Sequence, residues 1–315
     1  MGRDTPVDPI LLITPADPDG RNAPLVQQAL TVLRRATDVM VGSPTNPGEL
    51  DGLLHLRGGR RLVVAGSDAN LHVVLAALHR RSELGKVEVA LIPLGPNNDF
   101  ALRAGIPMQP ARSAELAAHG PARSVDAVVD CAGALVVHAV NVGVGAQAKR
   151  RIPSSRSPFG QVVNHNPEMS GTGNPGRRLR IEADGQLLTD MDRPIDQVRI
   201  SNGSIAPGQS GTASSPVTFG TVDSRTEGND GLLDVVVAFA ATPLRRLGRL
   251  VMPARRTSEQ LREFANVRAK EVSVTGPDFW VEADGAVVGP EHSRTWRVEP
   301  DALRMVLPTP REAGS

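Results

Sequence analysis

The feature that most constrains the fold is a regular alternation of apolar runs and helical patterns in the first 107 residues. Short, largely apolar runs stand at Ile10–Ile13, Arg61–Ala65 and Val87–Leu94, and segments with helical spacing occupy 23–35 and 71–78. An unbroken apolar run indicates a strand that is covered on both faces, and strands separated by helices indicate parallel βαβ units. This part of the chain therefore predicts an α/β region, in which ligands bind at the carboxyl ends of the strands.

The pattern changes near residue 124, where short strand patterns begin to follow one another across polar turns. Asp184-Gly185 and Asp284-Gly285 are strong hairpin signals. This succession of short strands and polar turns predicts an antiparallel β-sandwich. A helix at 258–264 and a polar surface loop at 149–176 are expected to interrupt it. The expected strands are 124–130, 134–142, 178–183, 186–191, 197–202, 232–240, 271–275 and 279–283.

Composition excludes several classes of function. The 35 basic and 34 acidic residues give a net charge of +1, and aromatic residues make up 3% of the chain, so nucleic acid is not an expected partner. Cys131 is the single cysteine, which excludes an intrachain disulfide and a multi-cysteine zinc site. No apolar run approaches the roughly 18 residues of a membrane span. We expect a cytoplasmic protein, for which peripheral contact with the inner membrane surface stays open.

Two polar loops carry the candidate chemistry. The segment GSDAN (66–70) follows the second apolar run, and PLGPNND (93–99) follows the third. Gly66 allows a sharp turn, Asp68 offers a carboxylate for a water molecule or Mg²⁺, and the second loop offers Asn98 and Asp99. Because neighbouring parallel strands end at the same edge of a sheet, both loops are expected on one rim. By itself, the first loop is better explained as an ordinary strand-to-helix turn with Asp68 or Asn70 as the N-cap.

The two loops resemble motifs of the diacylglycerol kinase catalytic domain family, which includes bacterial lipid kinases and sphingosine kinases and is related to NAD kinases. The family has a GGDGT turn where this chain has GSDAN, and a PLGTGNDFAR loop where this chain has PLGPNNDFAL (93–102). The resemblance covers nearly the whole chain in order. It continues through NVGVG (141–145), ISNG (200–203), DGLLDVVV (230–237), EADG (282–285) and ALRMVLP (302–308).

The resemblance implies an architecture and a reaction. An α/β nucleotide-binding domain at 1–123 would be joined by the returning C-terminal strand at 295–315, and a β-sandwich would span 124–294. ATP would bind between the two domains with Mg²⁺ near the acidic residues, and the γ-phosphoryl group would go to a hydroxyl of a diacylglycerol- or sphingoid-like lipid. Members of the family often form homodimers, so this chain could do the same.

The resemblance also assigns roles to residues. Asp68 matches the aspartate of GGDGT and Asp99 that of the NDF motif, so both are expected to be catalytic and to hold Mg²⁺. A DG-x-LD segment offers Asp230, Leu232 and Asp234 as a structural metal site, although a tight turn before a strand explains it equally well. The nucleotide is expected at Thr14, Gly20, Arg21, Gly66, Ser67, Asp68, Asn70, Gly95, Asn98 and Asp99.

The chain departs from the family at several positions. Ser67 and Ala69 replace glycines, and Ala286 stands where bacterial members have the glutamate general base of a DGE motif. Losing a general base typically lowers the rate about 10²–10⁴-fold. Glu282 is not expected to substitute, because the chain turns between the two positions. His72 and His79, seven residues apart on the predicted helix, are too far apart to share a metal ion.

Three functions stay open at this point. The first is an ATP-dependent lipid kinase. The second is a catalytically impaired relative that acts as a nucleotide-binding regulator or scaffold. The third is a kinase for a soluble small-molecule hydroxyl, which the polar 149–176 segment would suit better than a lipid.

Overall fold

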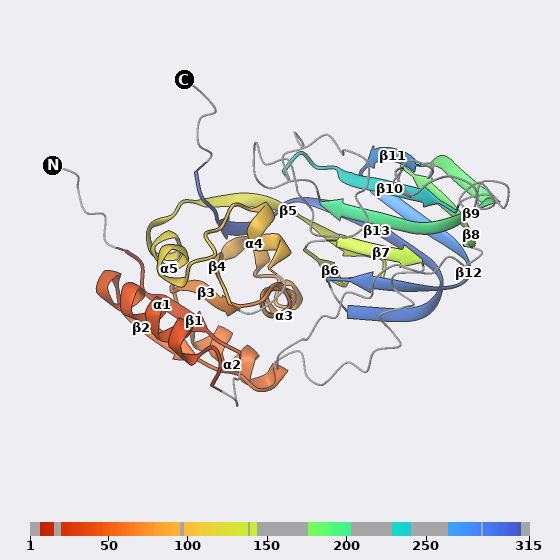
Figure 1. The fold of residues 1–315 in the computed structure, drawn as a ribbon. Helices are drawn as coiled ribbons and strands as arrows, with labels where there is room; N and C mark the ends of the chain where they lie inside the picture. The colour runs from red at the N-terminus through yellow and green to blue at the C-terminus, as the bar shows by residue number, and fades with distance from the viewer. Residues whose placement is uncertain are drawn as a thin grey trace, which may run out of the picture.

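The computed structural model describes residues 7–15, 20–94, 98–137, 139–143, 176–202, 229–240, 264–284 and 286–309. It has a mixed α/β fold with a strand-rich C-terminal region (Figure 1). The helices are α1 (Ala23–Ala36), α2 (Pro47–Leu56), α3 (Asp68–Arg80), α4 (Asp99–Arg103) and α5 (Pro110–His119), with a 3₁₀ turn η1 (Leu84–Lys86). The strands are β1 (Ile10–Ile13), β2 (Val39–Gly42), β3 (Arg61–Gly66), β4 (Glu88–Pro93), β5 (Ala122–Asp130), β6 (Leu135–Val136), β7 (Ala139–Gly143), β8 (Arg177–Ala183), β9 (Gln186–Asn202), β10 (Leu233–Phe239), β11 (Phe264–Ala269), β12 (Glu271–Ala283) and β13 (Ala286–Val306).

The first region is a parallel sheet in the order β4-β3-β1-β2, with helices on both faces. The side chains of β1 alternate between the two faces of the sheet. Leu11 and Ile13 pack with α2 and α3 on one face, whereas Ile10 and Leu12 pack with α1 and α5 on the other. Because both faces are covered, the strands need apolar residues at every position. The continuous apolar runs of the sequence have this physical origin.

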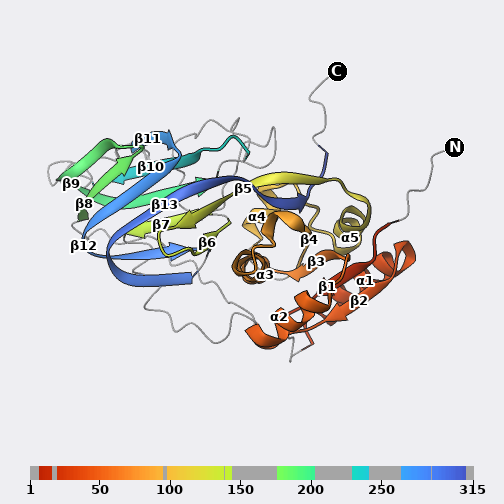
Figure 2. The same cartoon turned by 180° about the vertical axis from the view of Figure 1, so that it is seen from behind.

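The later strands form a second core, which includes Leu179, Val198, Val235, Phe279 and Trp296. They pair in the order β11-β10-β9-β7-β12-β13. Seen from behind, the strand-rich region lies beside the parallel sheet, and α3 and α4 occupy the side of the sheet nearest to it (Figure 2). The ends of β3 and β4 that precede these two helices therefore face the strand-rich region.

The last strand joins the two regions. The first part of β13 pairs with β12, and near its end Arg304 and Met305 pair in parallel with Glu88 and Val89 of β4. The expected domain limits at 123/124 and 294/295 fall inside β5 and β13, which pair with each other in antiparallel fashion. The two regions thus share continuous strands at their junction.

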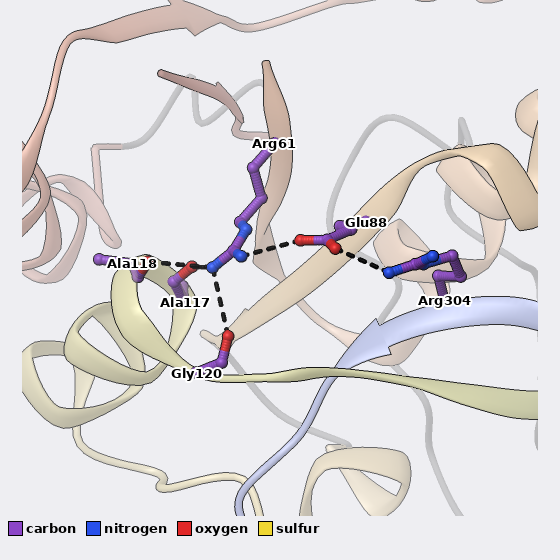
Figure 3. Close-up of polar contacts among 6 residues, drawn as sticks. All are labelled: Arg61, Glu88, Ala117, Ala118, Gly120 and Arg304. Atoms are coloured by element: carbon purple, nitrogen blue, oxygen red, sulfur yellow. Dashed lines mark hydrogen bonds and ion pairs between the residues drawn. The ribbon is translucent and has the colours of Figure 1, made fainter. Parts of the chain in front are cut away.

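A charged network joins the first residues of β3 and β4, Arg61 and Glu88, to their neighbours (Figure 3). It therefore lies at the opposite ends of these strands from the candidate loops. Arg61 Nη1 donates to the carbonyl oxygens of Ala117 and Ala118, both at 3.0 Å, near the end of α5. Arg61 Nη2 donates to Glu88 at 2.8 Å, and Glu88 also accepts from Arg304 at 2.9 Å. A cation at a helix C-terminus satisfies carbonyl groups that have no partner within the helix.

The spacing of apolar residues in the sequence did not predict two of the helices, α2 and α5. In α2, Asn46 accepts the N–H of Glu49 at 3.0 Å and Pro47 occupies the first turn, which is a regular helix start. In α5, alanines rather than large apolar residues face the core. Short contact surfaces of this kind give a weak periodic signal.

Several strands are longer or shorter than expected. The segments 186–191 and 197–202 belong to one strand, β9, and 271–275 and 279–283 belong to β12. The expected strand 134–142 is divided into β6 and β7. Phe264, the expected last residue of a helix, instead begins β11, while 258–263 and the loop residues 149–175 lie outside the described residues.

Candidate active site

The two polar loops lie side by side at the ends of β3 and β4. Gly66 and Pro93 are paired at the last position of these strands. Asp68 then begins α3 and Asp99 begins α4. The backbone N–H of Phe100 donates to Asp68 Oδ2 at 2.9 Å, so a side chain of the first loop caps the helix that follows the second. The structure brings Asp68 and the Asn98-Asp99 pair together.

Asp68 is half-buried, and its carboxyl group lies in an unfavourable electrostatic position. Its pKa is raised to about 7, mainly by loss of hydration, although the Phe100 N–H opposes the shift and Asp99 adds to it. Within the described part of the chain, Asp68 Oδ1 has no hydrogen-bond partner. The ionised form is therefore poorly hydrated, and the charged groups that act on its pKa, Asp99 and Asp284, are both acidic.

The donor chemistry of this pair fits Mg²⁺. Magnesium prefers oxygen ligands and is usually bound through one or two carboxylates together with substrate phosphates and water. Asp68 offers a buried oxygen without a partner, and Asp99 lies exposed at the start of α4. Asp68 and Asp99 are thus the residues that would hold the ion. Over the described ranges, no three His, Cys, Asp or Glu side chains are grouped closely enough to hold a metal by themselves.

Ser67 and Asn70 are bonded to each other at the start of α3. Asn70 Oδ1 accepts the backbone N–H and the hydroxyl of Ser67, both at 2.9 Å. A Cβ added at Gly66 would lie 2.7 Å from Asn70 Oδ1, so only glycine fits under this side chain. The N-cap is Ser67, and the amide of Asn70 occupies space beside the turn.

The N-terminal candidates lie at the ends of β1 and at the start of α1. Thr14 is buried, its hydroxyl is 2.6 Å from Ser43 Oγ, and it shares a small recess with Asn70. The walls of that recess are largely apolar and include Leu50, Val64, Val73 and Val74. Gly20 and Arg21 are exposed just before α1. Asn98 is buried at the N-cap of α4, and Gly95 lies outside the described residues.

The segment expected to hold a structural metal is engaged with other partners. Asp230 accepts the N–H of Leu232 at 3.0 Å and forms an ion pair with Arg268. Arg268 Nε also lies 3.4 Å from Asp234. The buried carboxylate of Asp126 accepts the Gly231 N–H at 2.8 Å. These contacts favour the tight-turn interpretation.

The strand-rich region adds an arginine that the sequence did not single out. Glu282, Asn141 and Arg199 are neighbours in register across β12, β7 and β9, on the face opposite the Val198 core. Burial lowers the pKa of Arg199, while the carboxylates of Asp99 and Glu282 oppose this shift. In the sequence, the alternation of polar and apolar residues in QVRISN (197–202) indicates that Arg199 lies on the opposite face of its strand from Val198 and Ile200.

A second arginine, Arg103, lies at the end of α4. Its pKa is lowered to about 10, first by burial and then by the nearby guanidinium of Arg199. Two arginines from separate regions therefore lie near each other and near Asp99. Positive charge in this position suits the phosphates of a nucleotide.

A second contact between the regions involves Asp284 and His72. Asp284 Oδ2 lies 2.8 Å from His72 Nδ1 on α3. The side chain of Ala286, at the family's general-base position, lies outside the described residues. Glu282 is paired with Val287, and Ala283 is paired with Ala286 across the turn.

A model of the diacylglycerol kinase catalytic domain matches residues 11–129. A protein from Shewanella frigidimarina, named 'probable lipid kinase YegS-like', is 32% identical over 100 residues. These residues are 31% of this chain and 32% of that protein. A protein of the same name from Xanthomonas oryzae pv. oryzae is 28% identical over 262 residues, 80% of each chain. The match to the Shewanella relative thus spans about a third of its length.

A solved structure shows the same fold along the chain. The crystal structure of a diacylglycerol kinase from Bacillus anthracis aligns with a TM-score of 0.63 and 17% identity, covering 96% of this chain and 98% of that one. The family model spans both polar loops and the sequence relatives carry kinase names, so the resemblance drawn from the motifs is confirmed. The family model over residues 11–129, the sequence relatives and the shared fold together support the diacylglycerol kinase catalytic domain family.

Proposed function

We propose that this protein transfers the γ-phosphoryl group of ATP to a hydroxyl of a diacylglycerol- or sphingoid-like lipid. The observation that carries the proposal is Asp68, a desolvated carboxylate beside Asp99 with one oxygen that lacks a partner among the described residues. Such a group is costly in a protein that binds no cation there. It suits a protein that binds Mg²⁺ with its nucleotide.

The chain's own residues would orient the nucleotide. The amino-terminal end of α3 favours negative charge, and Arg103 and Arg199 add positive charge near Asp99. Magnesium bound by Asp68 and Asp99 would neutralise phosphate charge. Phosphoryl transfer depends mainly on positioning and on charge stabilisation of this kind.

The proposal assigns different roles to the two parts of the chain. Residues 1–123 with 295–315 would bind the nucleotide, and 124–294 would complete the site with Arg199. The names of the sequence relatives support a lipid acceptor. No described helix is long and apolar enough to cross a bilayer. In this proposal, the lipid acceptor is reached by peripheral contact with the inner membrane surface.

The test is transfer from radiolabelled ATP to dioleoylglycerol in phosphatidylglycerol vesicles, with glycerol as a soluble acceptor. We expect Mg²⁺-dependent labelling of the lipid, at least 100-fold weaker in Asp68→Asn. Asp38→Asn is the matched control, since Asp38 is exposed and pairs only with Arg60 among the described residues. Labelling of glycerol alone would favour the soluble acceptor, and binding of ATP without transfer would favour the impaired alternative.

A further inference from the structure

Asp184 and Asp284, two turn residues of the strand-rich region, have nearly the same backbone contacts. Asp184 has a φ of +49°, and its carboxylate accepts the N–H groups of Lys270 at 2.9 Å and Glu271 at 2.8 Å. Its own N–H donates to the carbonyl of Glu271 at 3.0 Å. This aspartate ties its hairpin to the start of a neighbouring strand, which is a purely structural role.

Asp284 repeats this arrangement. Its φ is +46°, and its carboxylate accepts the N–H groups of Val137 at 2.7 Å and Ala139 at 3.1 Å. Its own N–H donates to the carbonyl of Ala139 at 3.1 Å. The comparison with Asp184 separates what an Asp-Gly turn needs for stability from anything that Asp284 does in addition.

The additional feature is the contact with His72. This contact, 2.8 Å from Asp284 Oδ2 to His72 Nδ1, joins the strand-rich region to α3. No histidine of the described ranges contacts Asp184, whose carboxylate bonds to backbone N–H groups. A carboxylate only accepts hydrogen bonds, so Nδ1 carries a proton, and in the neutral imidazole the lone pair is then on Nε2. Among the described residues Nε2 has no hydrogen-bond partner. The Asp284 side chain is 5% exposed and that of His72 is 25% exposed, so the pair is anchored on one side and accessible on the other.

His72 also lies beside the candidate magnesium ligand. It follows Asp68 by four residues on α3, a spacing that places two side chains on the same face with their Cβ atoms about 6 Å apart. The carboxylate of Asp284 is close enough to Asp68 to act on it electrostatically. An imidazole whose Nε2 has no partner among the described residues therefore lies one helical turn from the carboxylate of the proposed magnesium site.

We propose that His72 is the general base of the reaction and that Asp284 is the residue that positions it. This inference rests on the proposed phosphoryl-transfer function. His72 Nε2 takes the proton from the acceptor hydroxyl as its oxygen forms a bond to the γ-phosphorus. The bond from that phosphorus to the bridging oxygen breaks, ADP leaves with the electron pair, and the imidazolium later loses its proton to solvent. His72 thus fills the role that the side chain of Ala286 lacks.

A structural alternative is that the hydrogen bond from His72 to Asp284 only holds α3 against the strand-rich region. The variant His72→Asn separates the two roles, because its amide nitrogen can donate to Asp284 in place of Nδ1 but it has no counterpart of Nε2. If the role of His72 is only structural, this variant should have the wild-type kcat. A general base predicts a 10²–10⁴-fold lower kcat with an unchanged KM for ATP and an unchanged melting temperature. His79→Asn, on the same helix, is the matched control and should behave as the wild type.

The kinetic test uses the full chain with Mg-ATP and dioleoylglycerol vesicles. Loss of kcat in His72→Asn with retained ATP binding supports the inference, and wild-type kcat in that variant overturns it. If the wild type transfers no phosphoryl group to dioleoylglycerol or glycerol, the proposed function fails and the role of His72 as a base fails with it.

A spectroscopic test does not depend on the acceptor. In the protein labelled with ¹⁵N-histidine, the ring signals of His72, assigned by their absence in His72→Asn, should show a protonated Nδ1 and an unprotonated Nε2. Asp284→Asn should change that pattern, while Asp184→Asn should leave it intact. A protonated Nε2 with a bare Nδ1 in the wild type would overturn the arrangement.

Discussion

Replacing Asp68 by asparagine should stabilise the protein at pH 8 in the absence of Mg²⁺. The neutral amide keeps an oxygen that can accept the Phe100 N–H, and it removes a charge that burial disfavours. The pKa of Asp68 rises from 3.8 to about 7 on folding. At about 1.36 kcal/mol per pKa unit, this difference corresponds to roughly 4 kcal/mol of lost stability once the carboxyl group is ionised in both states.

The sign of the pH dependence follows from the raised pKa. Between about pH 4 and pH 7 the folded protein holds a proton at Asp68 that the unfolded chain has released. The free energy of unfolding that Asp68 contributes therefore falls as the pH rises through this window. The advantage of Asp68→Asn should be small at pH 4 and should reach its full size, roughly 4 kcal/mol, by pH 8.

Urea unfolding in EDTA at several pH values measures this difference, with Asp38→Asn as the control for loss of an exposed carboxylate. Addition of Mg²⁺ at pH 8 should then stabilise the wild type and leave Asp68→Asn unchanged. Equal pH dependence in the two proteins, or lower stability of Asp68→Asn at pH 8, would refute the account of Asp68 as a desolvated carboxylate.

Three further predictions concern packing and charge. Arg61→Ala should lower the free energy of unfolding by about 2–4 kcal/mol in urea, because it leaves carbonyl groups at the end of α5 without a donor; an effect below 0.5 kcal/mol would contradict this. Gly66→Ala should cost about 1–3 kcal/mol, since its Cβ would meet the Asn70 amide at 2.7 Å, and adding Asn70→Ala should recover part of the loss; no recovery would mean that the crowding lies elsewhere. Arg199→Met should raise the KM for Mg-ATP about tenfold, as expected for loss of a charged hydrogen bond, whereas Arg297→Met on the surface should not; equal KM values would remove Arg199 from the nucleotide site.

The parallel strands and their two loops could be predicted from sequence because their signals are local. β1, β3 and β4 are buried on both faces and so appear as continuous apolar runs. Asp68 and Asp99 follow two neighbouring strands that point the same way, so their proximity follows from topology. No tertiary information was needed for either inference.

Other elements were missed for physical reasons. β9 continues through Met191, which has a φ of +59°, and β12 continues across a register shift between Thr275 and Phe279. Such irregularities interrupt the alternation that identifies a strand. The pairing of His72 with Asp284 joins residues 212 positions apart from two different regions. Each residue alone has an ordinary local explanation, and only the folded chain brings them together.

The most direct test of the central claim is a calorimetric titration of the full chain with ATP, with and without Mg²⁺. The account predicts binding that requires Mg²⁺ and weakens at least tenfold in Asp68→Asn, while Asp38→Asn binds as the wild type does. Absence of binding heat for Mg-ATP at several temperatures, or equal affinity in Asp68→Asn, would contradict the claim that Asp68 and Asp99 form a magnesium–nucleotide site.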